Sequence, residues 1–182
     1  MLIRERRDED LSVCVELLRA VHEQAGYPVN WPADPGLWLT PEAALGCWVA
    51  VDGERVVGHV VLTGVDEPAG VGMGGDERAG VELGGDERAG VGMGGARRAE
   101  VERLFVDPAA TGRGTGRQLL DHCVTVAAGL GRELSLEVVD NRGAAERLYR
   151  RAGWTETGRT PIDWGGVHAT ELIRFSAPGS RA

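Results

Sequence analysis

The chain contains 182 residues, with 28 acidic and 20 basic side chains and a formal net charge of −8. This length suits one domain with its own hydrophobic core, and an acidic chain lacks the basic face that nucleic-acid binding requires. No uninterrupted apolar run reaches about 18 residues and the first ten residues are mostly charged, so we expect neither a membrane span nor a secretory leader.

The N-terminal segment combines a strand, a helix and a loop. Residues 2–6 predict a short strand, and Asp8 or Asp10 is placed to cap a helix whose apolar residues recur at helical spacing through Val21. Residues 26–35 contain three prolines and predict a loop.

Three cysteines, Cys14, Cys47 and Cys123, stand far apart in the sequence. Their odd number and wide spacing fit neither a disulfide scaffold nor a zinc site, both of which need clustered ligands. We therefore expect free thiols, no metal site and a reducing, cytoplasmic location.

A hairpin and then a repeat follow the loop. Two predicted strands, 47–51 and 55–63, flank the turn signal Asp52-Gly53. Residues 66–95 are three near-copies of a decapeptide (DEPAGVGMGG, DERAGVELGG and DERAGVGMGG), and eleven of these residues are glycine. Ordering so much glycine costs more backbone entropy than the few apolar side chains could offset, so the repeat is expected to be a flexible insertion.

The second half of the chain alternates strands with helices. We expect strands at 99–106 and 133–139, helices at 114–129 and 142–152, and two last strands near 154–159 and 168–175. This order predicts an α+β fold with mixed α/β layers. We expect a single domain over residues 1–176, interrupted by the 66–95 insertion, and a disordered tail over 177–182.

A glycine-punctuated turn joins the strand at 99–106 to the next helix. Gly112, Gly114 and Gly116 follow Asp107-Pro108 and lead into the amphipathic helix. Glycines let a backbone approach phosphate oxygens, and the amides that open a helix have no intrahelical partner, so this arrangement can bind a diphosphate. The spacing matches neither a P-loop nor the dinucleotide fingerprint, and taken alone it also fits an ordinary surface turn.

A second motif follows the glycine turn, and the two motifs together are more specific than either one alone. Its residues are Leu136, Val138, Asn141, Ala144 or Ala145, Leu148, Tyr149, Gly153 and Trp154. Together the two motifs resemble the GNAT acetyltransferase superfamily, whose acetyl-CoA signature is Gln/Arg-x-x-Gly-x-Gly/Ala. The chain departs from this signature at Thr111, which replaces the Gln or Arg. The resemblance covers roughly residues 2–175. It implies a central mixed, mostly antiparallel sheet flanked by helices, whose central strands splay apart to admit the pantetheine arm.

The resemblance implies an N-acetyltransferase that uses acetyl-CoA, without a metal, and binds it largely through main-chain groups. A bulged strand carrying Leu104, Phe105 and Val106 would pair with pantetheine and direct one amide at the acetyl oxygen. Asn141 would cap the following helix and touch the cofactor, and Tyr149 on that helix would protonate the departing thiolate. The diphosphate would lie on Thr111, Gly112, Arg113, Gly114, Thr115, Gly116 and Arg117.

Glu100, Glu102 and Glu137 are the candidates for the base. An alkyl ammonium with a pKa of about 10 must lose a proton before it attacks. If the first strand is regular, Glu100 and Glu102 share a face with Leu104. Glu100 matches the base of histone-acetylating relatives, and Glu137 matches that of relatives that acetylate ribosomal-protein N-termini. We favour Glu137. A water relay would make none of them indispensable, and each also fits an ordinary solvated glutamate.

Aromatic residues in two loops are the candidates for acceptor binding: Tyr27, Trp31, Trp38 and Trp164, with the neighbouring carboxylate Asp163. Ring faces and a carboxylate can receive a small cation, although the tryptophans equally fit the edge of the domain. The sequence therefore leaves two acceptors, a small-molecule amine and a peptide N-terminus. It also leaves two oligomeric states, a monomer and a homodimer.

Two other classes of function compete with an enzyme. One is a non-catalytic, regulatory module that binds acyl-CoA on the same fold. The other is an interaction protein that works through its acidic, glycine-rich repeats.

Overall fold

The computed structural model describes residues 1–65, 97–139, 143–161 and 171–179. The 66–95 repeats and three of the site candidates, Asn141, Asp163 and Trp164, lie outside these ranges. Among the described residues, no helix is both long enough and apolar enough to cross a membrane.

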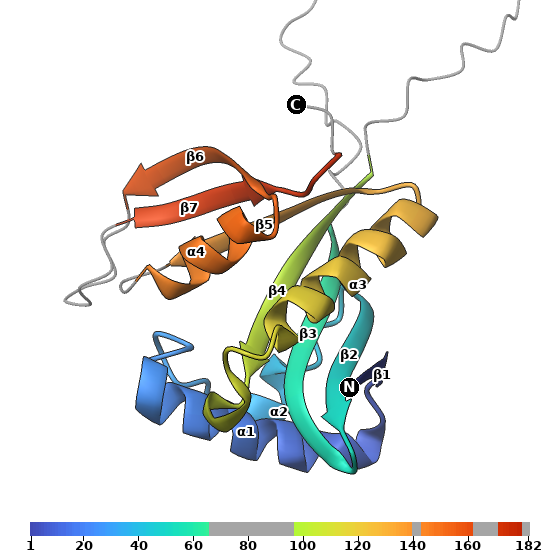
Figure 1. The fold of residues 1–182 in the computed structure, drawn as a ribbon, viewed down its shortest axis with the longest axis vertical. Coiled ribbons are helices and arrows are strands. Elements are labelled where there is room, and N and C mark those ends of the chain that lie inside the picture. Colours follow the sequence, from blue (N-terminus) through green and yellow to red (C-terminus); the bar gives the residue numbers. More distant parts are fainter. Residues whose placement is uncertain (66–96, 140–142, 162–170, 180–182) are drawn as a thin grey trace, which may run out of the picture.

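One seven-stranded sheet forms the centre of the fold, in the order β1-β2-β3-β4-β5-β7-β6 (Figure 1). The pairing of β4 with β5 is parallel, whereas every other pairing between the described strands is antiparallel. The predicted mixed, mostly antiparallel sheet is therefore confirmed. The strands are β1 (Leu2–Glu5), β2 (Ala44–Asp52), β3 (Arg55–Val65), β4 (Arg98–Val106), β5 (Glu133–Val139), β6 (Thr155–Pro161) and β7 (Glu171–Ser176).

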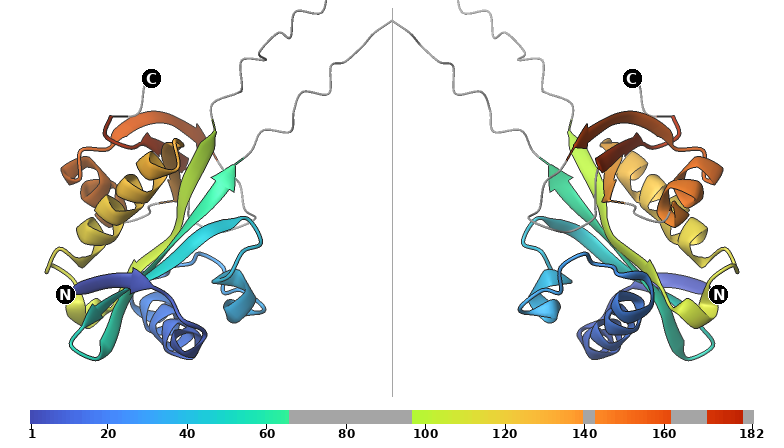
Figure 2. Two further views of the ribbon diagram at one scale, coloured as in Figure 1. Left: turned by 90° about the vertical axis from the view of Figure 1, so that its right-hand side faces the viewer. Right: turned by 90° about the vertical axis from the view of Figure 1, so that its left-hand side faces the viewer.

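Helices cover both faces of the sheet (Figure 2). Helices α1 (Leu11–Ala25) and α2 (Pro35–Trp38) lie on one face, and α3 (Thr115–Gly129) and α4 (Ala144–Arg151) lie on the other. Two short 3-10 turns, Asp8–Asp10 and Pro108–Ala110, precede α1 and the loop before α3.

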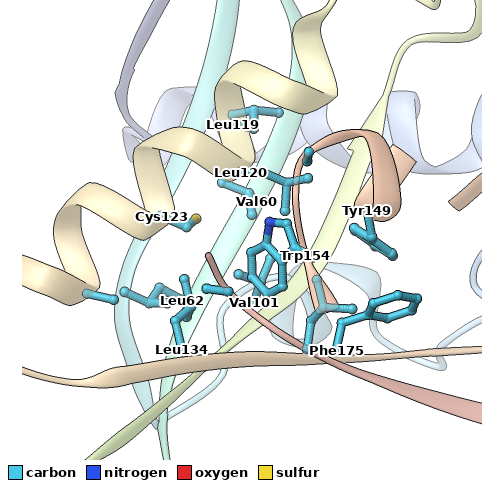
Figure 3. Close-up of a cluster of buried hydrophobic side chains, with 14 of the residues drawn as sticks. Val60, Leu62, Val101, Leu119, Leu120, Cys123, Leu134, Tyr149, Trp154 and Phe175 are labelled. Atoms are coloured by element: carbon cyan, nitrogen blue, oxygen red, sulfur yellow. The ribbon is translucent and has the colours of Figure 1, made fainter. Parts of the chain in front are cut away.

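A hydrophobic core lies on each side of the sheet. The α1-side core contains Cys14, Leu17, Leu18, Val21, Leu39, Val49, Val51 and Phe105. The larger α3-side core joins α3 and the strands to Tyr149, Trp154 and Phe175, as Figure 3 shows. Cys14 and Cys123 are buried in these cores, and burial raises the pKa of each thiol to about 12. All three cysteines are free.

Two helix caps differ from the sequence-based expectation. Helix α1 begins at Leu11 without a side-chain cap, because the Asp10 carboxylate binds the Arg4 guanidinium at 2.6 and 2.9 Å and the Arg7 amide at 2.7 Å. Helix α4 begins at Ala144, with Gly143 at its N-cap position and a φ of 69°. Asp10 therefore occupies the predicted N-cap position of α1, but its carboxylate does not bind the amides of that helix, and Asp8 belongs to the preceding 3-10 turn. Asn141, predicted to cap α4, lies outside the described residues.

The ends of two elements matter for the domain boundaries. Val65 of β3 pairs directly with Arg98 of β4, so the chain leaves and re-enters the sheet at neighbouring positions. At the C-terminal end, Ala177 is buried and its amide donates to the Leu134 carbonyl at 2.9 Å. Ordered packing thus continues into the first residue of the predicted tail.

Candidate active site

The sheet splits between β4 and β5. Their parallel pairing joins only Arg98–Val101 to Glu133–Leu136, and beyond these residues the two strands diverge. Figure 1 shows β5 turning away with β6, β7 and α4 from the sheet half that contains β4. Beyond the split, β4 still pairs with β3 and β5 still pairs with β7, but the facing edges of β4 and β5 no longer pair with each other, which is the splay that the family resemblance implies.

Two cavities meet in this split. A large cavity of about 560 Å³ lies between the end of β4, the loop 110–114, the start of α3, and α4. A small cavity of about 230 Å³ lies among β4, Glu137 and Val138 of β5, the loop residue Tyr27, and Trp38 at the end of α2. Leu104 and Tyr149 line both cavities. A molecule in the large cavity could therefore present one end to a second molecule in the small cavity.

A bulge in β4 lies where the cavities meet. His59 of β3 pairs with Phe105 and Val61 pairs with Glu102, so two residues of β4, Arg103 and Leu104, lie opposite one residue of β3. Arg103 has a φ of 51°, in the left-handed region that a non-glycine residue rarely adopts. Such a bulge turns backbone groups out of the ladder, as binding of the pantetheine arm would need.

The bulge also changes which face each later β4 residue occupies. Leu104 packs against the α3-side core, whereas Phe105 belongs to the α1-side core. Because the strand is not regular, the expectation that Leu104 shares a face with Glu100 and Glu102 is wrong.

The glycine turn lies at the mouth of the large cavity. Gly112 and Gly114 have φ values of 78° and 81°, and a Cβ at either position would meet no described heavy atom within 4 Å. Helix α3 follows directly, so the free amides of its first turn and the turn itself border the cavity. Main-chain donors placed in this way can bind a diphosphate.

Two arginines of the turn behave differently. Arg117 lines the large cavity, where its Nε donates to Asp121 at 2.8 Å and its Nη1 donates to the Arg151 carbonyl at 3.1 Å. Arg113 does not line the cavity: its exposed guanidinium is 3.8 Å from an Asp52 carboxylate oxygen. The other turn candidates, Thr111, Gly112, Gly114, Thr115 and Gly116, and the strand candidates Leu104, Phe105 and Val106, all line it.

Tyr149 is held by packing at the meeting point. Its side chain is buried, and its ring centroid lies 5.5 Å from that of Phe175 and 6.3 Å from that of Trp154. Figure 3 shows it beside these two residues at the edge of the α3-side core. Tyr149 therefore both packs in the core and lines the two cavities.

The three candidate bases have different surroundings. Glu102 and Glu137 line the small cavity, and each forms an ion pair with an arginine, Arg103 and Arg174 respectively. Glu100 lies with Glu137 in a neighbouring hollow of about 310 Å³. Burial, and then the charges of Glu137 and Glu102, raise the pKa of Glu100 above its ordinary value. A raised pKa strengthens a carboxylate as a base.

The predicted acceptor aromatics are only partly brought together. Tyr27 and Trp38 line the small cavity and contact each other with ring centroids 6.2 Å apart. Burial raises the pKa of the Tyr27 phenol, which is therefore neutral at physiological pH. Trp31 is not in the lining; it packs against α1, 5.3 Å from the His22 ring and 5.6 Å from the Arg19 guanidinium carbon.

Apart from Tyr149, sequence reasoning missed the residues that α4 contributes to the large cavity. Ala144, Ala145 and Leu148 line it opposite the glycine turn, and Arg151 borders it. A Cβ on Gly116 would lie 3.2 Å from Leu148, so this glycine lets α3 and α4 approach closely. The small residues of the second motif were the available signal. Within the described ranges, no cluster of His, Cys, Asp and Glu side chains is arranged to hold a metal ion.

Comparisons with known proteins agree with this geometry. The sequence model of the acetyltransferase (GNAT) family matches residues 14–154. The peptidyl-lysine N-acetyltransferase YjaB of Salmonella typhimurium is 33% identical over 63 residues, which are 35% of this chain and 41% of that protein. The Escherichia coli protein of the same name is also 33% identical over 63 residues. The match thus spans about two fifths of the length of these relatives.

Solved structures show the fold. Arabidopsis thaliana NAA60 in complex with acetyl-CoA has a TM-score of 0.67 at 18% identity, over 96% of this chain and 97% of that one. Ribosomal-protein-alanine N-acetyltransferase from Brucella melitensis has a TM-score of 0.64 at 20% identity, over 97% and 98% of the two chains. The predicted fold is confirmed.

Proposed function

Because the chain belongs to the acetyltransferase (GNAT) family, we propose that it transfers the acetyl group of acetyl-CoA to a primary amine by direct attack in a ternary complex. The observation that carries this proposal is the meeting of the two cavities at Leu104 and Tyr149. Acetyl-CoA would occupy the large cavity and the amine would enter the small one. Direct transfer needs both reactants held at one point, which removes the entropy cost of a chance encounter.

The cofactor would be held mainly by the backbone. Gly112, Gly114 and the first turn of α3 would bind the diphosphate, with Arg117 and Arg151 adding positive charge. The bulged segment of β4 would pair with the pantetheine arm as an additional strand. An amide near Leu104 would donate to the thioester carbonyl, and such a preorganised donor contributes roughly 3 kcal/mol to the stability of a developing oxyanion.

The amine would lose its proton to a carboxylate in the small cavity, directly or through water. We assign this role to Glu137, which lines both the small cavity and the neighbouring hollow. Glu100, with its raised pKa, is the second candidate, and Glu102 is the third. As the new C–N bond forms and the C–S bond breaks, the departing thiolate would take a proton from the Tyr149 hydroxyl. The amide nitrogen loses its second proton, through water, to the Tyr149 phenolate, which restores the tyrosine, and solvent removes the first proton from the glutamate.

We further propose that the acceptor amine belongs to a peptide. The matched curated relatives are named for peptidyl-lysine, and a similar solved structure is named for a ribosomal-protein alanine. Tyr27 and Trp38 would contact the residue that carries the amine, and Glu137 would attract its positive charge. A small-molecule amine is the alternative acceptor.

Calorimetric titration with acetyl-CoA, followed by thiol-release assays on an amine panel, tests this function. The panel contains a peptide with a free N-terminus, an N-blocked peptide with one lysine, and a polyamine. We expect binding and release of coenzyme A with at least one peptide. Binding without turnover on any amine would favour the non-catalytic module, and no binding would leave the role of the repeats as the remaining hypothesis.

A further inference from the structure

His59 is a fully buried histidine on β3 that pairs with Phe105, directly beside the bulge of β4. Its Nδ1 lies 3.1 Å from the carbonyl oxygen of Arg103, and its Nε2 lies 3.2 Å from Nη1 of Arg6. A guanidinium has only donors, so Nε2 must be the acceptor and the ring hydrogen must be on Nδ1. His59 therefore donates a hydrogen bond to the carbonyl of the bulge residue.

The same ring is fixed by stacking and by its charge state. It stacks on Phe105 with centroids 5.1 Å apart and an interplanar angle of 22°. Burial, together with the positive charges of Arg6 and Arg103, lowers the pKa of His59 to about 4, although the bond to the Arg103 carbonyl acts in the opposite direction. The imidazole is thus neutral at physiological pH, and only this form can accept from Arg6 while donating to Arg103.

Arg6 connects His59 to the acceptor side of the split. Its Nη1 also donates to the Leu39 carbonyl at 2.7 Å, and its Nη2 donates to Oγ1 of Thr40 at 2.6 Å. These two residues directly follow α2, which ends at Trp38, a residue of the small cavity. Arg6 therefore holds the C-terminal end of α2 against β3.

A contact between the side chains of Arg103 and Trp38 connects the bulge directly to α2. The Arg103 guanidinium carbon lies 5.0 Å from the centroid of the Trp38 ring, within the range of a cation–π interaction. Arg6, His59, Arg103 and Trp38, which we call the His59 network, thus join four separate segments of the chain. The network has one end at the thioester-binding bulge and the other at the wall of the acceptor cavity.

We propose that His59 is a positioning residue that holds the β4 bulge and the α2 wall of the acceptor cavity in one fixed relation. The inference rests on the proposed acetyl transfer. In this role His59 contacts neither reactant. The hydrogen bond that His59 donates to the Arg103 carbonyl sets the direction of the backbone groups that follow Arg103, and the bond that His59 accepts from Arg6 sets the position of Trp38. Both reactants are then held at the distance that attack requires, which a small displacement would abolish.

Three substitutions separate the two bonds. In His59→Asn the side-chain amide replaces Nδ1 and keeps a donor for the bulge, whereas in His59→Gln it replaces Nε2 and keeps an acceptor for Arg6. His59→Phe keeps the ring that stacks on Phe105 and removes both bonds. Thermal unfolding tests whether each variant is folded, and His122→Gln serves as control, because His122 on α3 lines neither cavity.

We expect the turnover number to fall at least tenfold in His59→Phe and His59→Gln, which lose the donor, but less than threefold in His59→Asn. His59→Asn should instead raise the KM of the acceptor at least fivefold, because α2 is no longer tied to β3. The dissociation constant of coenzyme A should change less than twofold in all three, since the glycine turn is untouched. Equal effects in the Asn and Gln variants, or a folded His59→Phe with unchanged turnover, would overturn the inference.

A spectroscopic measurement on the unmodified protein tests the same inference without activity. Long-range proton–nitrogen NMR correlations should place the His59 hydrogen on Nδ1, and a hydrogen on Nε2 would contradict the network. If the protein binds acetyl-CoA but transfers no acetyl group, the proposed function fails, while this measurement still decides the arrangement of the network.

Discussion

Replacing Tyr149 with phenylalanine tests the proposed chemistry most directly, because it removes one hydroxyl and keeps the ring. The contacts with Phe175 at 5.5 Å and Trp154 at 6.3 Å survive in Tyr149→Phe. We therefore expect the free energy of unfolding to change by about 1 kcal/mol or less, the net value of one hydrogen bond. Truncation to alanine would empty this part of the core and cost about 3–5 kcal/mol.

The expected kinetic effect of Tyr149→Phe is larger and depends on pH. General acids contribute about 100-fold or more, and we expect the lower value, about 2.7 kcal/mol of barrier, because a thiolate is already a fair leaving group. The deficit should shrink as pH rises above about 8.5, the ordinary pKa of a thiol, since the thiolate then no longer needs a proton.

Thiol release at saturating acetyl-CoA and acceptor, from pH 6.5 to 9.5, measures this deficit. The KM of acetyl-CoA should change less than twofold, because the glycine turn and the first turn of α3, which would bind the diphosphate, are unchanged in this variant. A loss of less than threefold at pH 7, or an equal loss at every pH, would refute the role of Tyr149 as the acid.

Three further substitutions test the glycine turn, the base and the N-terminal ion pair. Gly114→Val should raise the KM of acetyl-CoA at least tenfold, whereas Gly131→Val, at a φ of 63° outside the large cavity, should bring similar backbone strain of about 1–2 kcal/mol and leave that KM unchanged. Glu137→Gln should reduce turnover at least tenfold at pH 7, with Glu133→Gln on the same strand as control; a loss of less than threefold would eliminate Glu137 as the base. Asp10→Asn should lower the free energy of unfolding by about 2 kcal/mol at pH 7, because the hydrogen bond from its arginine partner lowers the Asp10 pKa from 3.8 to about 2. Protonation of the folded carboxylate removes this contribution. Urea titrations should therefore show the full difference in free energy of unfolding between the unmodified protein and Asp10→Asn above pH 4, and the loss of this difference as the pH falls through 2. A difference that does not vary with pH would contradict the reasoning.

The β4 bulge shows why some of the site was not predicted from the sequence. Ala99 and Val101 are buried at odd positions and Glu100 and Glu102 are polar at even ones, whereas Leu104 packs on the same side as Val101. The sequence shows that the apolar–polar alternation breaks at Arg103, but whether the strand ends or bulges there depends on its pairing with a partner strand. The bulge follows from pairing with β3, which is a non-local interaction.

Local sequence patterns predicted the site correctly where the residues involved are close together in the sequence. The glycine turn and the start of α3 are close in sequence, so their joint lining of the large cavity was predictable. Trp31 and Trp38 were indistinguishable as loop aromatics. Their separation, one against α1 and the other in the small cavity, depends on how the loop folds back on the sheet.

The pairing of Val65 with Arg98 has a consequence for how this chain tolerates change. Because Val65 and Arg98 stand opposite each other in adjacent strands, the length of the segment between them does not affect the register of β3 and β4. Closing a longer loop between fixed ends costs only about 0.6 kcal/mol for each doubling of its length. We therefore expect that whole decapeptides can be added or removed at this junction without changing the register of β3 and β4.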